Sequence, residues 1–147
     1  MTKYTVKDVM VPNPIIMTPD STLREATEQM EKIDCGIMPI GTPDKLIGMI
    51  TDRDIAIRAV AKGKDPQKTK VKDIMTNKVL AVSEDSSIVE AAEIIRTHKI
   101  NRLIVKDKKG KVSGILSLSG LIRESSDVKA IAHFVHQLAA HNHKTAA

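Results

Sequence analysis

One segment of this chain is present twice. Val6-Lys7-Asp8-Val9-Met10 returns as Val71-Lys72-Asp73-Ile74-Met75, at an offset of 65 residues (71 − 6). The same offset joins further similar pairs: Thr18/Ser83, Ser21/Ser86, Leu23/Ile88, Ala26/Ala91 and Met30/Ile95. After one extra residue in a turn of the second copy, the offset is 66 residues: Gly48/Gly114, Ile50/Leu116 and Thr51/Ser117. A repeat that stays in register over most of the chain indicates a duplicated structural unit.

Both copies show the same order of sequence patterns. Each begins with an extended segment (15–17 and 79–82), followed by a helix (22–33 and 87–98), two strands (38–41 with 46–51, and 102–106 with 112–117) and the start of another helix (52 and 118). Residues at helical spacing form one stripe on each first helix: Leu23, Ala26, Thr27 and Met30, and then Ile88, Ala91, Ala92 and Ile95. The sequence predicts an α+β fold of two pseudo-symmetric β-α-β-β-α units that pack as a pair.

The duplication also sets the predicted domain boundaries. The first domain covers residues 6–62 and the second covers residues 71–124, with a Gly- and Pro-containing linker at 63–70. The remaining residues, 125–147, carry apolar side chains at helical spacing. They predict a C-terminal helix that packs on the pair or on a partner chain.

Composition excludes several classes of protein. The chain has 41% apolar residues, yet no stretch approaches the roughly 20 apolar residues of a transmembrane helix. No apolar segment typical of a secretion signal follows its first residues. Cys35 is the single cysteine, which excludes an internal disulfide bond. We therefore expect a cytoplasmic protein that does not contact membranes.

The net charge of +5 raises nucleic acid as a partner. Tyr4 and Phe134 are the only aromatic residues, so the chain offers no stacking platform for unpaired bases. The densest basic run, residues 106–111, is typical of a solvated turn between two strands. A basic nucleic-acid-associated protein is therefore the second hypothesis, and we do not expect nucleic acid as the main partner.

Three segments carry a resemblance to a known family. These are Val6-Lys7-Asp8-Val9-Met10, Gly36-Ile37-Met38-Pro39-Ile40 and residues 46–54. They resemble the cystathionine β-synthase (CBS) domain, and the two copies, residues 6–124, are similar to a free-standing tandem CBS pair. The resemblance implies a non-catalytic regulatory protein that needs no cofactor. It also implies a homodimer of disc-like shape and an adenosine-containing ligand (AMP, ADP, ATP or S-adenosylmethionine) in the cleft between the copies.

The best candidate site lies where residues 46–51 meet the next helix. In the family, a Thr or Ser at a strand end, followed after two residues by Asp, contacts the ribose, and Thr51 and Asp54 fit this pattern. A carboxylate can accept hydrogen bonds from both ribose hydroxyls, and Arg53 adds a cation for phosphate. The same spacing is also typical of a helix N-cap with its capping acid. In the second copy Gly120 takes the place of the acid, so we expect one strong site per chain.

The resemblance assigns the rest of the pocket. Its base-contacting positions correspond to Ile16, Thr18, Gly36, Ile37, Met38 and Pro39. Plain core packing is the alternative for the apolar members of this set. Arg102 stands beside a strand where the first copy has an apolar residue, so it is a candidate for phosphate or for a surface salt bridge.

Other chemistry has weaker support. The tail carries a group of histidines (His133, His136, His141 and His143), which makes metal binding an alternative function. No cysteine or clustered acid completes a metal set there, so we assign no metal ligands. Cys35 corresponds to Ile100 and is interpreted as a small packing residue. We find no catalytic residues and predict a sensor that signals to an unidentified effector protein.

Overall fold

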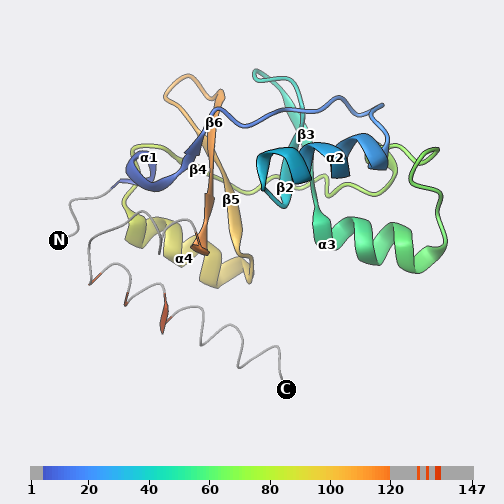
Figure 1. Cartoon of the computed structure of the whole chain (residues 1–147). Helices are drawn as coiled ribbons and strands as arrows, with labels where there is room; N and C mark the ends of the chain where they lie inside the picture. Colours follow the sequence, from blue (N-terminus) through green and yellow to red (C-terminus); the bar gives the residue numbers. More distant parts are fainter. Residues whose placement is uncertain (1–4, 120–128, 130–131, 133–134, 137–147) are drawn as a thin grey trace. The chain divides into compact units, whose positions relative to one another are not determined.

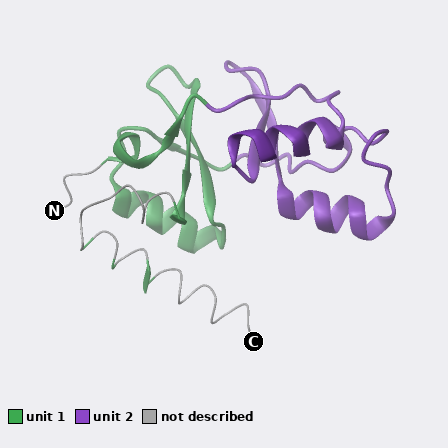
Figure 2. Cartoon of the chain, viewed as in Figure 1, with its two compact units in different colours: residues 1–13, 80–147 green, residues 14–79 purple. Residues whose placement is uncertain are grey.

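The computed structural model describes residues 5–119, 129, 132, 135 and 136. The chain divides into two compact units, shown in separate colours in Figure 2. Among the described residues, unit 2 is the continuous stretch Pro14–Val79, whereas unit 1 combines 5–13 with the residues from Leu80 onward. The α+β class predicted from the duplication is confirmed, because each unit combines helices with a sheet (Figure 1).

Unit 2 contains the candidate site. Its elements are α2 (Leu23–Ile33), β2 (Ile37–Gly41), β3 (Leu46–Thr51), α3 (Asp52–Asp54), the π-helical segment η1 (Ile55–Ala59) and the 3-10 segments η2 (Val60–Lys62) and η3 (Val71–Asp73). The side chain of Thr22 caps α2 by accepting from the backbone N–H of Glu25 at 3.2 Å. Asp34 ends the helix in the left-handed conformation, with φ of 51°. The helix predicted for residues 22–33 is confirmed.

The core of unit 2 lies between α2 and the two-stranded sheet. Strands β2 and β3 pair antiparallel, and Met17 joins β2 through a parallel bridge to Ile40. The buried cluster is Met17, Leu23, Ala26, Met30, Met38, Ile40, Ile50, Ile55, Ala59, Val71 and Ile74. Thr27 was predicted on this stripe but is exposed, since its hydroxyl donates to the carbonyl of Leu23 at 2.6 Å instead of packing inward.

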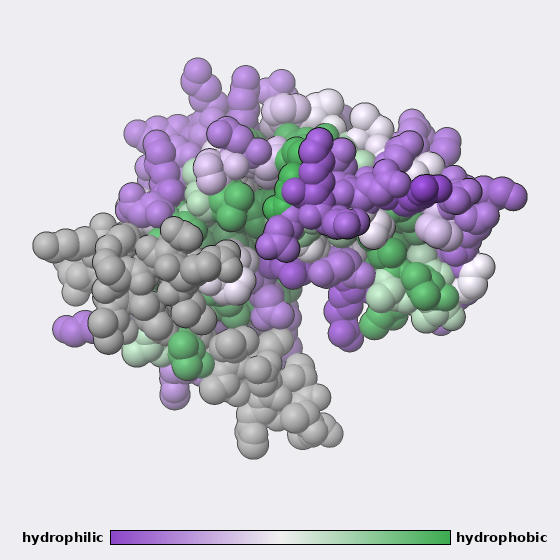
Figure 3. Space-filling view, in the orientation of Figure 1, coloured by the Kyte–Doolittle hydropathy of each residue, from purple (hydrophilic) through white to green (hydrophobic). Residues whose placement is uncertain are grey.

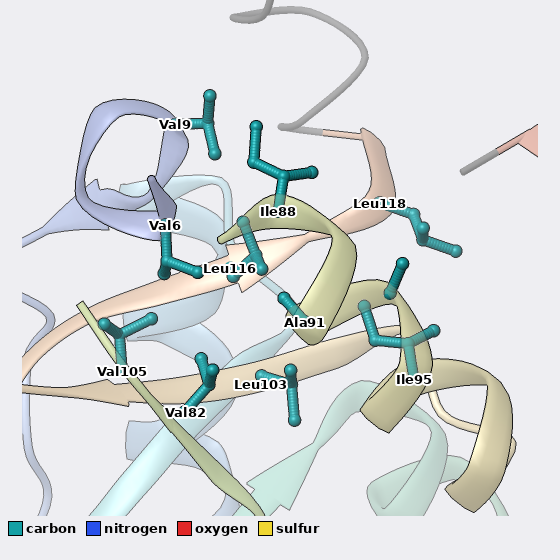
Figure 4. Packing of buried hydrophobic residues seen from close by; sticks show 11 residues of the cluster. Val6, Val9, Val82, Ile88, Ala91, Ile95, Leu103, Val105, Leu116 and Leu118 are labelled. Carbon is teal, nitrogen blue, oxygen red and sulfur yellow. The ribbon is translucent and has the colours of Figure 1, made fainter. Parts of the chain in front are cut away.

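Unit 1 has a four-stranded sheet with the order β1-β6-β5-β4. Its elements are α1 (Val6–Val9), β1 (Val11–Pro12), β4 (Ala81–Ser83), α4 (Ile88–His98), β5 (Arg102–Lys106) and β6 (Val112–Ser117). Figure 4 shows Leu103 and Leu116 of the sheet facing Ile88, Ala91 and Ile95 of α4. All four residues of the stripe predicted on this helix are buried.

The turn between β5 and β6 has the form predicted for the basic run. The Asp107 carboxylate accepts from the backbone N–H groups of Lys109 at 2.9 Å and Lys111 at 3.0 Å. Hydrophilic residues cover much of the visible surface in Figure 3. An apolar patch interrupts them over the helical stretch that follows β3, where Ile57 is 47% and Val60 is 68% exposed.

The opening motif of each copy packs with the other copy. The N–H of Val6 donates to the carbonyl of Ser86 at 2.9 Å, and the N–H of Val71 donates to the carbonyl of Ser21 at 2.8 Å. Each of the two hydrogen bonds lies inside one unit, because residues 5–13 and Ser86 belong to unit 1 and Val71 and Ser21 belong to unit 2. The repeat seen along the sequence and the units seen in space therefore have different boundaries.

The sequence also predicted a C-terminal helix and no membrane-spanning segment. Most of the predicted C-terminal helix lies outside the described residues, as do His133, His141 and His143. His136 is described and exposed. Among the described residues, no helix combines the length and the apolar character needed to cross a membrane.

Candidate functional site

Thr51 and Asp54 form a reciprocal capping pair at the end of β3. The Thr51 hydroxyl accepts from the backbone N–H of Asp54 at 3.1 Å, and Oδ2 of Asp54 accepts from the backbone N–H of Thr51 at 3.0 Å. This is the geometry of the helix-cap alternative that the spacing predicted. The Asp54 side chain is 15% exposed. The sheet and its cap therefore fix the acid in one place, with part of the side chain open.

Capping leaves Asp54 capacity to accept more hydrogen bonds. A carboxylate has about four lone-pair positions, and the cap occupies one of them on Oδ2. Oδ1 forms an ion pair with Nε of Arg58, at 3.8 Å. At that distance the ion pair is loose, so Oδ1 can still take a hydroxyl donor. The cap and a ligand role are compatible in this geometry.

Two further predicted residues lie directly beside Thr51. Ile37, the first residue of β2, pairs with Thr51 in the antiparallel register. The carbonyl of Gly36 accepts from the backbone N–H of Asp52 at 3.0 Å. The start of β2 and the end of β3 thus bring Gly36, Ile37, Thr51 and Asp54 into one part of unit 2.

The predicted residues of the preceding segment lie along the same sheet. The N–H of Met17 donates to the carbonyl of Pro39 and its carbonyl accepts from Gly41, both at 2.9 Å. Met17 itself is buried in the core, while Ile16 is half-buried and Thr18 is exposed. This is the alternation of an extended segment with one buried face.

Met38 differs from its neighbours on β2. Its side chain is fully buried and belongs to the core cluster with Ile40, whereas Ile37 is buried outside that cluster. Successive strand residues point to opposite faces, so Ile37 and Pro39 face away from α2. Only the backbone of Met38 is available to a ligand on that side, which is the packing role weighed as the alternative for this residue.

The two predicted cations are placed differently. Arg53 is exposed in α3, and its backbone N–H donates to the Asp52 carboxylate at 2.9 Å. Arg102 begins β5 of unit 1 and is half-buried. It is the one predicted site residue outside unit 2, and its role stays a prediction.

The corresponding position of the second copy has a related backbone but different side chains. The N–H of Leu118 donates to the carbonyl of Asn101 at 3.2 Å, as Asp52 does to Gly36. The Ser117 hydroxyl lies 3.3 Å from that of Ser119. Gly120 lies outside the described residues, and having no side chain it supplies no carboxylate.

Sequence reasoning missed Arg58, which contacts the candidate acid. The available signal was its spacing of four residues from Asp54, which places two helical side chains on the same face. In the second copy, at the offset of 66 residues, the same positions hold Gly120 and Glu124. The acid and its cation are thus both present in the first copy and both replaced in the second.

Comparison with known proteins identifies the family. The CBS domain matches residues 6–60 and 71–127. The CBS domain-containing protein YhcV of Bacillus subtilis (strain 168) is 32% identical over 136 residues, which are 90% of this chain and 96% of that protein.

Two solved structures with the same fold carry adenosine compounds. The CBS domain pair of protein MJ0100, in complex with 5′-methylthioadenosine and S-adenosyl-L-methionine, has a TM-score of 0.72 and 29% identity and covers 82% of this chain and 94% of its own. CBSX2 in complex with AMP has a TM-score of 0.67 and 28% identity, with coverage of 86% and 98%. This chain therefore belongs to the CBS domain family and contains the domain twice.

Proposed function

We propose that this protein is a non-catalytic sensor whose ligand is an adenosine compound held at the sugar by Thr51 and Asp54. The observation that carries the proposal is the placement of a partly open carboxylate and a hydroxyl at the end of β3, beside Gly36 and Ile37. Two relatives that share the fold are known in complex with AMP or with 5′-methylthioadenosine and S-adenosyl-L-methionine.

The chemistry of those compounds supports the sugar as the recognised group. AMP carries a phosphate and 5′-methylthioadenosine does not, and the part that all three compounds share is the adenosyl group, adenine on a ribose with free 2′- and 3′-hydroxyls. Its ribose presents two neighbouring hydroxyl donors, which match a carboxylate acceptor. We assign the flat base to the face that carries Ile16, Ile37 and Pro39, and phosphate, where a ligand has one, to Arg53.

We also propose that ligand occupancy is passed to an effector protein. A ligand shifts an equilibrium between two states only by the difference in its affinity for them, so the effector has to distinguish those states. The homodimer implied by the family resemblance remains part of this proposal. The exposed Ile57 and Val60 support it, because apolar patches on a surface are typical of protein contacts.

Isothermal titration of the full chain with AMP, ATP and S-adenosylmethionine tests the proposal. The unaltered protein is expected to bind at least one of them. Asp54→Ala is expected to weaken that binding by about tenfold or more, because hydrogen bonds to a charged group are worth about 1.5–3 kcal/mol.

Loss of the helix cap has to be separated from loss of a ligand contact. Glu25→Ala removes the capping acid of α2 in the same unit, where Oε2 of Glu25 accepts from the N–H of Thr22 at 3.1 Å. It is expected to lower the melting temperature as Asp54→Ala does and to leave the affinity unchanged. Equal affinities for Asp54→Ala and the unaltered protein would contradict the role of Asp54.

A further inference from the structure

Arg58 joins the candidate ligand acid to a distant stretch of chain. Its Nε lies 3.8 Å from Oδ1 of Asp54. Its Nη1 donates to the carbonyl of Ile74 at 3.0 Å and to that of Met75 at 3.4 Å, and it lies 3.3 Å from the hydroxyl of Thr76. One guanidinium thus contacts both Asp54 and residues 74–76, which lie at the start of the second copy.

Residues 74–76 are held in unit 2 without Arg58. The N–H of Thr76 donates to the carbonyl of Met49 at 2.8 Å, and the N–H of Met49 donates back to Thr76 at 2.9 Å. Ile74 is 4% exposed and belongs to the core. The Arg58 side chain is 49% exposed, and ion pairs with that much solvent contact contribute little to stability. The ion pair between Arg58 and Asp54 therefore adds little to the stability of unit 2.

The second copy shows that this fold does not need the polar network. Its equivalent of the Met49–Thr76 bridge is the pairing of Ile115 with Val11 in β6 and β1. The backbone pairing is therefore present in both copies. Three side chains make the network in the first copy, and the corresponding positions of the second copy hold residues of another type: Asp54/Gly120, Arg58/Glu124 and Thr76/Val11. The residues of the Arg58 network are therefore present only in the copy that has the acid, whereas the strand pairing is present in both copies.

We propose that Arg58 is a positioning residue that acts through Asp54: it orients the carboxylate for the ligand and links ligand occupancy to the attachment of residues 74–76. This inference rests on the proposed function, since it needs a ligand at Asp54. Donors of one planar guanidinium serve both groups, so its position has to satisfy both at once. Coupling of this kind is reciprocal: if the attached segment favours binding, binding favours the attached segment by the same factor.

The test uses Arg58→Gln in the full chain and two measurements. Titration with AMP, ATP and S-adenosylmethionine gives the affinity, and we expect a loss of about fivefold, the lower end of typical coupling. Amide hydrogen exchange gives the attachment of the segment through the N–H groups of Met49 and Thr76. In the unaltered protein the ligand is expected to slow exchange at both amides, and in Arg58→Gln this slowing is expected to disappear.

Two further variants make the result specific. Asp20→Asn removes an exposed ion pair from the same stretch of chain at a point away from Asp54, where Oδ1 of Asp20 contacts Nζ of Lys72 at 3.0 Å and of Lys70 at 3.5 Å. It is expected to keep full affinity and the full ligand effect on exchange. Arg58→Lys retains a cation and is expected to recover part of the affinity, which a variant that merely perturbs folding would not do.

The outcomes separate this inference from the function on which it depends. If the unaltered protein binds none of the three compounds, the proposed function fails and the inference fails with it. If the unaltered protein binds and Arg58→Gln shows the same affinity and the same ligand effect at Met49 and Thr76, the inference alone is overturned. If Asp20→Asn loses as much affinity as Arg58→Gln, the effect belongs to the segment and not to Arg58, and the inference is again overturned.

Discussion

Asp20 lies between two lysines that precede and follow Val71. Hydrogen bonding and charge from Lys72, with a smaller contribution from Lys70, lower the pKa of Asp20 below its usual 3.8. Hydrogen bonding to Asp20 raises the pKa of Lys72 above its usual 10.5. The two pKa values move in opposite directions, and both movements favour the charged form of the group, so the charged pair favours the folded state.

The pH dependence of this ion pair follows from the signs of the two shifts. The Asp20 contribution is present above pH 3.8 and is lost as the pH falls through its lower folded pKa, while the Lys72 contribution is lost only as the pH rises above 10.5. The difference in melting temperature between the unaltered protein and Asp20→Asn is therefore expected to be constant near neutral pH and to vanish in acid. Calorimetry across the acid range measures it. A difference that stays constant as the pH falls through the acid range would contradict the assignment.

At the site, sequence reasoning reached Asp54 but could not decide between its two roles. The spacing of Thr51 and Asp54 fits both a helix cap and a ribose contact, and the structure shows the cap on Oδ2 and a loose ion pair on Oδ1. The family resemblance placed Met38 among the base-contacting positions, with core packing as the alternative. Side chains alternate between the two faces of β2, and the side chain of Met38 lies on the core face. The resemblance gave the position of Met38 in the sequence but not the face of the strand on which its side chain lies.

At the scale of the elements, the opening motif of each copy packs closely against a glycine of a strand. A Cβ atom added to Gly48 would lie 2.7 Å from the carbonyl oxygen of Thr76 and 2.8 Å from Sδ of Met75. The equivalent Gly114 lies against the equivalent methionine, Met10, in unit 1. The duplicated glycine and the duplicated methionine thus form one packing arrangement, used once in each unit.

Gly48→Ala is therefore expected to destabilise unit 2. The methionine can move but the backbone carbonyl of Thr76 cannot move without breaking its pairing with Met49, so the cost is about 1–3 kcal/mol, the usual range for overpacking. Urea unfolding measures the change. Glu31→Ala, at an exposed position of α2, is the control and is expected to stay within about 0.5 kcal/mol. An unchanged midpoint for Gly48→Ala would show that this contact is not tight.

Most elements could be predicted because hydrophobic spacing and capping residues are local. Both 11-residue helices and all four hairpin strands match their predicted positions to within a residue. The packing of residues 5–13 with the second copy could not be predicted, since a repeat gives the position of a segment along the chain and not its partner in space. The two-residue strand β1 and the π-helical segment Ile55–Ala59 carry no periodic signal of their own.

At the scale of the whole molecule, the two copies share a scaffold and differ at the site. Both keep the strand pairing, the opening motif and the glycine that the motif covers. The carboxylate and its cation are present only in the first copy, as Asp54 and Arg58. Duplication explains the shared fold, and the difference between the copies is what predicts unequal ligand sites.

The number of ligands bound per chain tests this account most directly. Titration calorimetry with the adenosine compound that binds best, at protein concentrations well above its dissociation constant, gives that number without any substitution. We predict one strong site per chain, because one copy has Asp54 and the other has Gly120. Two sites of equal affinity, or none, would contradict the account.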